Sequence, residues 1–136
     1  MSLRGGLERV DLSGGVGSIT SSIVVDDGFE PIGYLYGGAI VKVAVIDASL
    51  GYLFFRDEYD LSGPVYKTHP FDPSSGSVDT LTTLLDGSAV YDMVADSNGD
   101  LFVVATDGLY EIRRTDYHIT GPIDVGTNPV DLSVDR

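Results

Sequence analysis

The stretch that decides the fold reads Val90-Tyr91-Asp92-Met93-Val94-Ala95-Asp96-Ser97-Asn98-Gly99-Asp100-Leu101-Phe102-Val103-Val104-Ala105. Its two apolar runs flank Asn98-Gly99, a dipeptide favoured in tight hairpin turns because both residues tolerate a positive φ. Residues 101–105 are apolar without alternation, which is typical of a strand buried on both faces. The stretch therefore predicts a β-hairpin whose second strand lies inside a sheet.

Short apolar runs bounded by Gly, Asp, Ser or Pro continue along the whole chain, and no 12-residue window has the apolar spacing of a helix. Residues 52–55 form a second run without alternation, whereas residues 110–114 alternate and predict an edge strand with one face in water. We expect an all-β protein with strands near 6–12, 18–26, 32–36, 39–47, 51–57, 64–71, 77–85, 90–96, 100–106, 108–115, 121–125 and 129–135.

Composition narrows the class of protein. The 136 residues suffice for one domain with a core, and 21 acidic against 8 basic side chains give a net charge of −13. This acidity argues against nucleic acid as a partner, because a phosphate backbone needs a basic face. No apolar run reaches the roughly 20 residues of a membrane-spanning helix, so we expect no membrane span. The absence of cysteine excludes disulfides and thiolate nucleophiles.

Similar segments recur along the chain. Residues 90–96 resemble residues 129–135, and residues 45–54 resemble residues 94–102 in the order of their apolar, acidic and glycine positions. Recurrence at about 40–50 residues, with four strands in each unit, is the pattern of propeller blades.

Two segments also resemble a known family. Residues 91–103 look like the first hairpin of a blade in the broad bacterial β-propeller superfamily. Residues 121–134 resemble the YVTN-type repeat, in which a strand, a Gly-x-Asn-Pro turn (126–129) and the next strand follow in order. This resemblance, to YVTN-like and NHL-like repeats, implies a partial β-propeller built of four-stranded antiparallel blades. It also implies a bacterial periplasmic or cell-surface location, which is common among such proteins.

The resemblance divides the chain into blades within a single all-β domain, residues 1–136. The expected order is a half blade at 6–27, a long blade at 28–86, a blade at 87–125 and the first strand of a next blade at 129–135. Two to three blades cannot close a ring of four to eight. We therefore expect either a fragment of a longer protein or self-association through open blade edges. An independent β-sandwich is the alternative architecture.

The turn of the central hairpin is a candidate metal site. Asp96, Asn98 and Asp100 place side-chain oxygens at alternate positions, as a loop for calcium or another divalent cation does. An EF-hand would continue with Gly at the sixth position and Glu at the twelfth, but this chain has Leu101 and Asp107 there. The alternative is a plain hairpin turn. We predict no other cofactor.

Asp92 and Asp131 occupy corresponding places in two similar segments, near the starts of expected inner strands. They are therefore candidates to line the channel of a propeller, and the alternative role for each is a turn-capping carboxylate. His69 and His118 are the only histidines, and we interpret both as surface or turn residues. The sequence contains no Gly-x-Ser-x-Gly, His-Glu-x-x-His or P-loop motif.

These observations favour a non-catalytic binding or scaffold module with a protein or carbohydrate partner. The alternative is part of a propeller hydrolase, similar to lactonases, with a divalent metal in the central channel.

Overall fold

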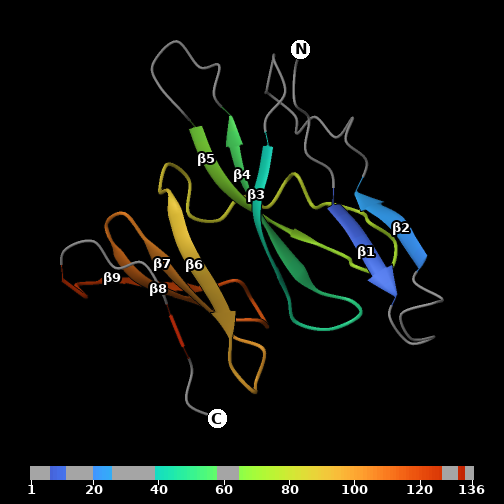
Figure 1. The fold of residues 1–136 in the computed structure, drawn as a ribbon. Helices are drawn as coiled ribbons and strands as arrows, with labels where there is room; N and C mark the ends of the chain where they lie inside the picture. The colour runs from blue at the N-terminus through green and yellow to red at the C-terminus, as the bar shows by residue number, and fades with distance from the viewer. Residues whose placement is uncertain (1–6, 12–19, 26–38, 58–64, 127–131, 134–136) are drawn as a thin grey trace.

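The computed structural model describes residues 7–11, 20–25, 39–57, 65–126 and 132–133, and within them the protein is all-β, as predicted. The described strands form three antiparallel sheets (Figure 1). The strands are β1 (Leu7–Asp11), β2 (Thr20–Val25), β3 (Ala39–Val45), β4 (Gly51–Asp57), β5 (Val65–Phe71), β6 (Val90–Ala95), β7 (Leu101–Ala105), β8 (Gly108–Ile112) and β9 (Ile119–Ile123). The strand expected at 32–36, Asp131 and most of 129–135 lie outside the described residues.

The sheet β6-β7-β8-β9 is a meander in which each strand pairs with the next along the chain. The hairpin expected around Asn98-Gly99 joins β6 to β7, and Gly99 adopts the positive φ of 85° that such a turn requires. β7 lies inside the sheet, and Leu101, Val103 and Ala105 are fully buried on one of its faces. β8 alternates in burial as predicted, but it pairs with β9, so β9 is the edge strand.

The second sheet, β3-β4-β5, has β4 at its centre. Residues 52–55 of β4 are all buried, which confirms the prediction of a strand covered on both faces. The strand expected at 77–85 is not continuous: only Val78 and Leu84 form isolated bridges, to Phe71 and Thr68 of β5. Between those bridges Asp79 Oδ1 accepts hydrogen bonds from the backbone N–H groups of Leu81 and Thr82, which bends the chain into a turn.

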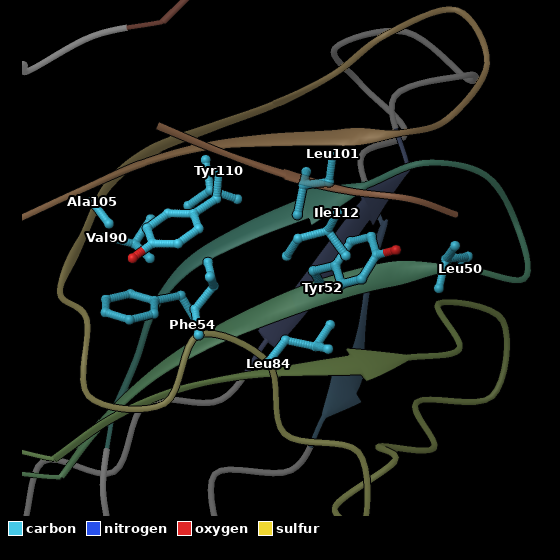
Figure 2. Close-up of a cluster of buried hydrophobic side chains, with 11 residues drawn as sticks. Leu50, Tyr52, Phe54, Leu84, Val90, Leu101, Ala105, Tyr110 and Ile112 are labelled. Atoms are coloured by element: carbon cyan, nitrogen blue, oxygen red, sulfur yellow. The ribbon is translucent and has the colours of Figure 1, made fainter. Parts of the chain in front are cut away.

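The main core lies between these two sheets (Figure 2). Tyr52 and Phe54 project from β4 towards Leu101, Val103 and Ile112 of the other sheet. Phe54 also stacks on Tyr66, with the ring centroids 5.8 Å apart. The buried members of the cluster are Leu50, Tyr52, Phe54, Leu84, Leu85, Val90, Leu101, Val103, Ala105, Tyr110 and Ile112.

A smaller cluster lies on the opposite face of β4, where Leu53 and Phe71 are buried against the partly buried Leu7, Ile40 and Val78. Gly51 is required here, because a Cβ at that position would lie 2.3 Å from a carbon of the Phe71 ring. β1 therefore lies on the side of the β3-β4-β5 sheet that faces away from β6-β7-β8-β9, as Figure 1 also shows.

The β3–β4 hairpin and the β6–β7 hairpin share one register. In the first, Ile40 pairs with Phe55 and Lys42 with Phe54; in the second, Val90 pairs with Ala105 and Asp92 with Val104. Both ladders shift at the same place, after Ile40 and after Val90, and both end at the turn between their strands. The pairs of the second hairpin are those of the first with 50 added to each residue number. Within the described residues, no helix is long and apolar enough to cross a membrane.

Candidate functional site

Three turns meet at one end of the two sheets and border an open cavity of about 280 Å³. One turn joins β3 to β4, the second follows β5, and the third joins β8 to β9. We name this space the Tyr117 cavity, and its lining residues are Ser49, Leu50, Pro70, Phe71, Asp72, Ser77, Asp79 and Tyr117. The wall therefore combines two aromatic rings, two carboxylates and two serine hydroxyls, and it contains no Lys, Arg or His.

The two carboxylates of the cavity are held by the turns that carry them. Asp72 Oδ1 accepts hydrogen bonds from the N–H and Oγ of Ser74, at 2.8 and 2.6 Å, and from the N–H of Ser75. Hydrogen bonds from Ser74 lower the pKa of Asp72, and a hydrogen bond from the Thr82 side chain is the main cause that lowers the pKa of Asp79. Both groups are consequently ionised at neutral pH, and the cavity wall is negatively charged.

The core beside the cavity contains an unusual hydroxyl group. Tyr52 is completely buried, and its hydroxyl has no hydrogen-bond partner among the described residues. Burial raises the pKa of Tyr52 to about 12, so the group is neutral. Figure 2 shows this hydroxyl directed towards Leu50, and the Tyr52 ring meets Tyr117 edge to face at 6.3 Å. Leu50 and Tyr117 both line the cavity, so the hydroxyl lies directly behind its wall.

Tyr117 is held at the cavity by a strained backbone conformation. Its φ is 56°, a region in which residues other than glycine are uncommon. The corresponding turn after β5 has the same two backbone hydrogen bonds, from Asp72 to Ser77 and from Gly76 to Asp72, and it has glycine at this position with a φ of 74°. A tyrosine here costs about 1 kcal/mol or more in backbone strain, and in return it places a ring on the cavity wall.

An ion pair between Asp47 and Arg114 ties the two sheets together beside this cavity. Hydrogen bonds from the backbone and side chain of Ser49 are the largest cause of the low Asp47 pKa of about 2, and Arg114 lowers it further. Arg114 also lines a second cavity of about 280 Å³ with residues of the β3–β4 and β6–β7 turns, namely Val45, Ile46, Ala95, Asp96, Ser97 and Gly99.

The predicted metal ligands lie at the β6–β7 turn, where the Asp96 oxygens bind the turn itself and Asp100 binds the backbone after β8. Asp96 Oδ1 accepts hydrogen bonds from the N–H groups of Asn98 (2.8 Å) and Asp100 (3.0 Å). Asn98 Nδ2 donates to Asp96 Oδ2, and Asp100 Oδ1 accepts from the Arg114 N–H. This geometry matches the hairpin alternative, and within the described residues no group of three His, Cys, Asp or Glu residues is placed to hold a metal. A calcium site here stays a prediction.

Asp92, the first channel candidate, lies on β6 where the two sheets are closest. Its Oδ1 is 3.8 Å from Lys42 Nζ of β3, and its Oδ2 accepts a hydrogen bond of 3.0 Å from the Leu132 N–H. The carboxylate thus links three segments of the chain. Asp131, the second candidate, is outside the described residues, so no geometry brings the two together.

The two histidines differ. His118 is exposed in the β8–β9 turn, as expected, and its N–H donates to Asp116 Oδ1. His69 is only 2% exposed on β5, so the interpretation as a surface residue is wrong for it. The reason is that β5 is covered on this side: His69 pairs with the buried Leu53, and its Nδ1 lies 3.0 Å from the Thr82 carbonyl oxygen.

The Tyr117 cavity was not predicted from the sequence. Its residues come from turns that are distant along the chain, and Asp, Ser and Pro are ordinary turn residues whatever their function. A single signal was present: Tyr117 occupies the turn position that Gly76 fills in Asp72–Ser77, and an aromatic residue in place of glycine is unusual.

Comparisons with known proteins complete the description of the site. No family model matches this chain, and neither curated proteins nor solved structures gave a match.

Proposed function

We propose that this protein is a non-catalytic binding or scaffold module, built as a segment of a β-propeller, in which one face of the β6-β7-β8-β9 sheet receives another sheet. The observation that carries the proposal is the common register of the two hairpins. Through this register the apolar side chains of this face correspond to those of the β4 face that already packs against β6-β7-β8-β9.

The face in question is opposite the core. Phe102 and Val104 of β7 point to the side of the sheet opposite the core cluster, and Val94 and Leu109 pair with them across the ladder. We name it the outer face, with Val94, Phe102, Val104, Leu109 and Ile123 as its members. Ile123 is 52% exposed and Val94, Phe102 and Leu109 are partly buried, whereas Val104 is only 2% exposed, so part of this face is already covered. Among the described residues no second sheet packs on this side. An apolar sheet face of this kind favours association.

The shared register supports a particular occupant. Ala44, Tyr52 and Phe54 are the residues of the first hairpin that correspond to Val94, Phe102 and Val104. Ala44, Tyr52 and Phe54 all pack against the β6-β7-β8-β9 sheet. A further sheet with the register of β6-β7-β8-β9 would therefore fit the outer face in the same way. In a second copy that face of β6-β7-β8-β9 is already covered by β3-β4-β5, so the copy would present its β1-β2 sheet to the outer face, and such head-to-tail contact of copies allows a ring or a filament.

The hydrolase alternative has less support. It needs carboxylates that are available for a metal, but Asp92 is engaged by Lys42 and by the Leu132 N–H. Divalent metal that binds the folded state would raise the melting temperature by mass action. We expect no such increase with calcium, manganese or zinc, and an increase that Asp92→Asn removes would favour the hydrolase.

The proposal is tested by light scattering coupled to size-exclusion chromatography. We expect a mass of two or more chains for the wild type and a shift to one chain for Ile123→Glu. The matched control is Leu81→Glu, which changes a side chain that is 91% exposed and far from the outer face, and which should keep the wild-type mass. The measurement is repeated over a range of protein concentrations. A wild type whose mass stays at 14.5 kDa at every concentration would show that copies do not use this face.

A further inference from the structure

We propose that the Tyr117 cavity binds an organic ammonium group, supplied by a small amine or by a lysine side chain of a partner. This site is separate from the outer face, so the proposal does not depend on whether copies of the chain associate. It rests on the shape, charge and hydrogen-bonding groups of the cavity.

The cavity is large enough for a small ligand and is built from both sheets. Its volume is about 280 Å³, which lies near the lower end of typical small-molecule sites. Ser49 and Leu50 come from the β3–β4 turn, and Tyr117 comes from the β8–β9 turn. The Asp47–Arg114 ion pair links the backbone segments that carry these two turns.

The charge of the wall selects a cation. Asp72 and Asp79 are both ionised at neutral pH, and the cavity lining contains no basic side chain. The net charge of −13 on the chain adds a long-range field that raises the local concentration of cations. A neutral sugar would leave this charge unused, and an anion would be repelled.

The aromatic and hydroxyl groups select an organic ammonium over a bare metal ion. Tyr117 lines the cavity with an aromatic ring, and ring faces attract ammonium groups and their attached CH₂ groups; Phe71 also lines the cavity, but it is only 3% exposed. The Tyr52 hydroxyl lies behind Leu50 and Tyr117 without a hydrogen-bond partner among the described residues, and a buried polar group of this kind needs an explanation. An N–H donor that displaces the Leu50 or Tyr117 side chain would give it a partner.

The groups that act on the site from neighbouring elements are few. His69 of β5 acts electrostatically on Asp79, and Arg114 acts on Tyr52 while it is paired with Asp47. Neither is part of the lining. A ligand ammonium would therefore be the main positive charge within the cavity itself.

The test uses the full chain, labelled with ¹⁵N, and four probes: cadaverine, Nα-acetyl-lysine amide, calcium chloride and methyl glucoside. With each probe at up to about 10 mM, in the range where weak sites fill, we expect both amines to shift the amide signals of Ser49, Ser77 and Tyr117. Stronger binding of the lysine amide would indicate a partner lysine, and stronger binding of cadaverine a free amine. We expect no shift at these residues with methyl glucoside.

Three variants and one control make the result specific. Asp79→Asn keeps an oxygen for the Leu81 and Thr82 N–H groups, and it should weaken amine binding at least tenfold. Tyr117→Gly restores the residue type found at Gly76, so the turn should form while amine binding is lost. Tyr52→Phe should weaken binding several-fold and leave the fold intact. Asp124→Asn removes an exposed carboxylate outside the cavity and should change nothing.

Several outcomes would overturn the proposal. Calcium that shifts the same residues with higher affinity than the amines would make this a metal site. Methyl glucoside that binds as well as the amines would make it a sugar site. Amine shifts that spread evenly over the exposed carboxylates, with the Asp124→Asn control affected like Asp79→Asn, would mean nonspecific attraction to an acidic protein. Unchanged spectra with both amines would refute the site altogether.

Discussion

Asp47 and Arg114 form an ion pair between turns of two different sheets, although they are 67 positions apart in the chain. The same Asp47 carboxylate accepts hydrogen bonds from the Ser49 N–H at 2.7 Å and from Ser49 Oγ at 2.8 Å. One oxygen thus shapes the β3–β4 turn while the other reaches the neighbouring sheet. This arrangement predicts how the protein responds to acid.

The stability of the protein should fall in the acid range where Asp47 gains a proton. The pKa of Asp47 is about 2 in the folded protein, below the ordinary value of 3.8. A depressed pKa means that the stabilisation is fully present above the ordinary value and is lost as pH falls towards 2. We expect the free energy of unfolding in urea, followed by circular dichroism, to decrease between pH 5 and pH 2.

The Asp47→Asn variant isolates this contribution. Asp72 and Asp79 also have lowered pKa values and titrate in both proteins, so the decrease should become shallower without disappearing. Asp124→Asn serves as the control for loss of an exposed charge and should keep the full wild-type slope. If Asp47→Asn also kept that slope, the Asp47 carboxylate, with its contacts to Ser49 and Arg114, would have no role in acid stability.

Removal of the Tyr52 hydroxyl and removal of the Tyr110 hydroxyl should affect the stability of the protein differently. Tyr52→Phe deletes a buried hydroxyl without a partner among the described residues, so we expect stability to stay the same or rise. Tyr110→Phe deletes a hydroxyl that donates to Asp107, so we expect a loss of about 1 kcal/mol. Urea unfolding of the two variants side by side checks this. Equal losses would contradict the absence of a partner for Tyr52.

Gly51→Ala should destabilise the protein by about 2–3 kcal/mol, because the added methyl group overlaps the Phe71 ring and approaches the Ala44 carbonyl oxygen at 2.9 Å. Thermal unfolding measures the loss. The comparison variant is Gly87→Ala, where nothing lies within 4 Å of the new Cβ and only the positive φ of 89° opposes it. Its cost should be about 1 kcal/mol. Phe71→Leu should recover part of the Gly51→Ala loss.

Leu101→Ala should cost about 2–5 kcal/mol, because Leu101 is fully buried between the sheets and its removal leaves a cavity. Leu81→Ala truncates the same side chain at a position that is 91% exposed, and it should change stability by at most about 0.5 kcal/mol. Urea denaturation of the two variants compares their free energies of unfolding directly. A small effect at Leu101 would show that the two sheets do not form one cooperative core.

Local patterns explain why the strands could be predicted. The unbroken apolar runs at 52–55 and 101–105 identified central strands, and Asn98-Gly99 located the turn between β6 and β7. Both signals depend on neighbouring residues only. The strand expected at 77–85 was less regular than predicted because Asp79 binds the backbone of Leu81 and Thr82 instead of leaving it to the ladder.

The site could not be predicted in the same way. His69 resembles any polar residue near a strand end, and its burial depends on what covers β5 from other parts of the chain. The position of Tyr117 in one cavity wall with two turns of the other sheet depends equally on long-range packing. Asp96, Asn98 and Asp100 were correctly recognised as oxygen-rich, but a turn that binds its own backbone and a turn that binds a cation use the same residue types.

The common register of the two hairpins limits how this chain can be lengthened. A further hairpin with the same ladder would preserve every cross-strand pair, and its residue in the place of Lys42 and Asp92 would lie on the corresponding face of its own sheet. Insertion or deletion of one residue within a strand would turn the buried side chains that follow it outwards. The ladder therefore fixes the strands that a duplication must copy, whereas the length of the connecting turns is free to vary.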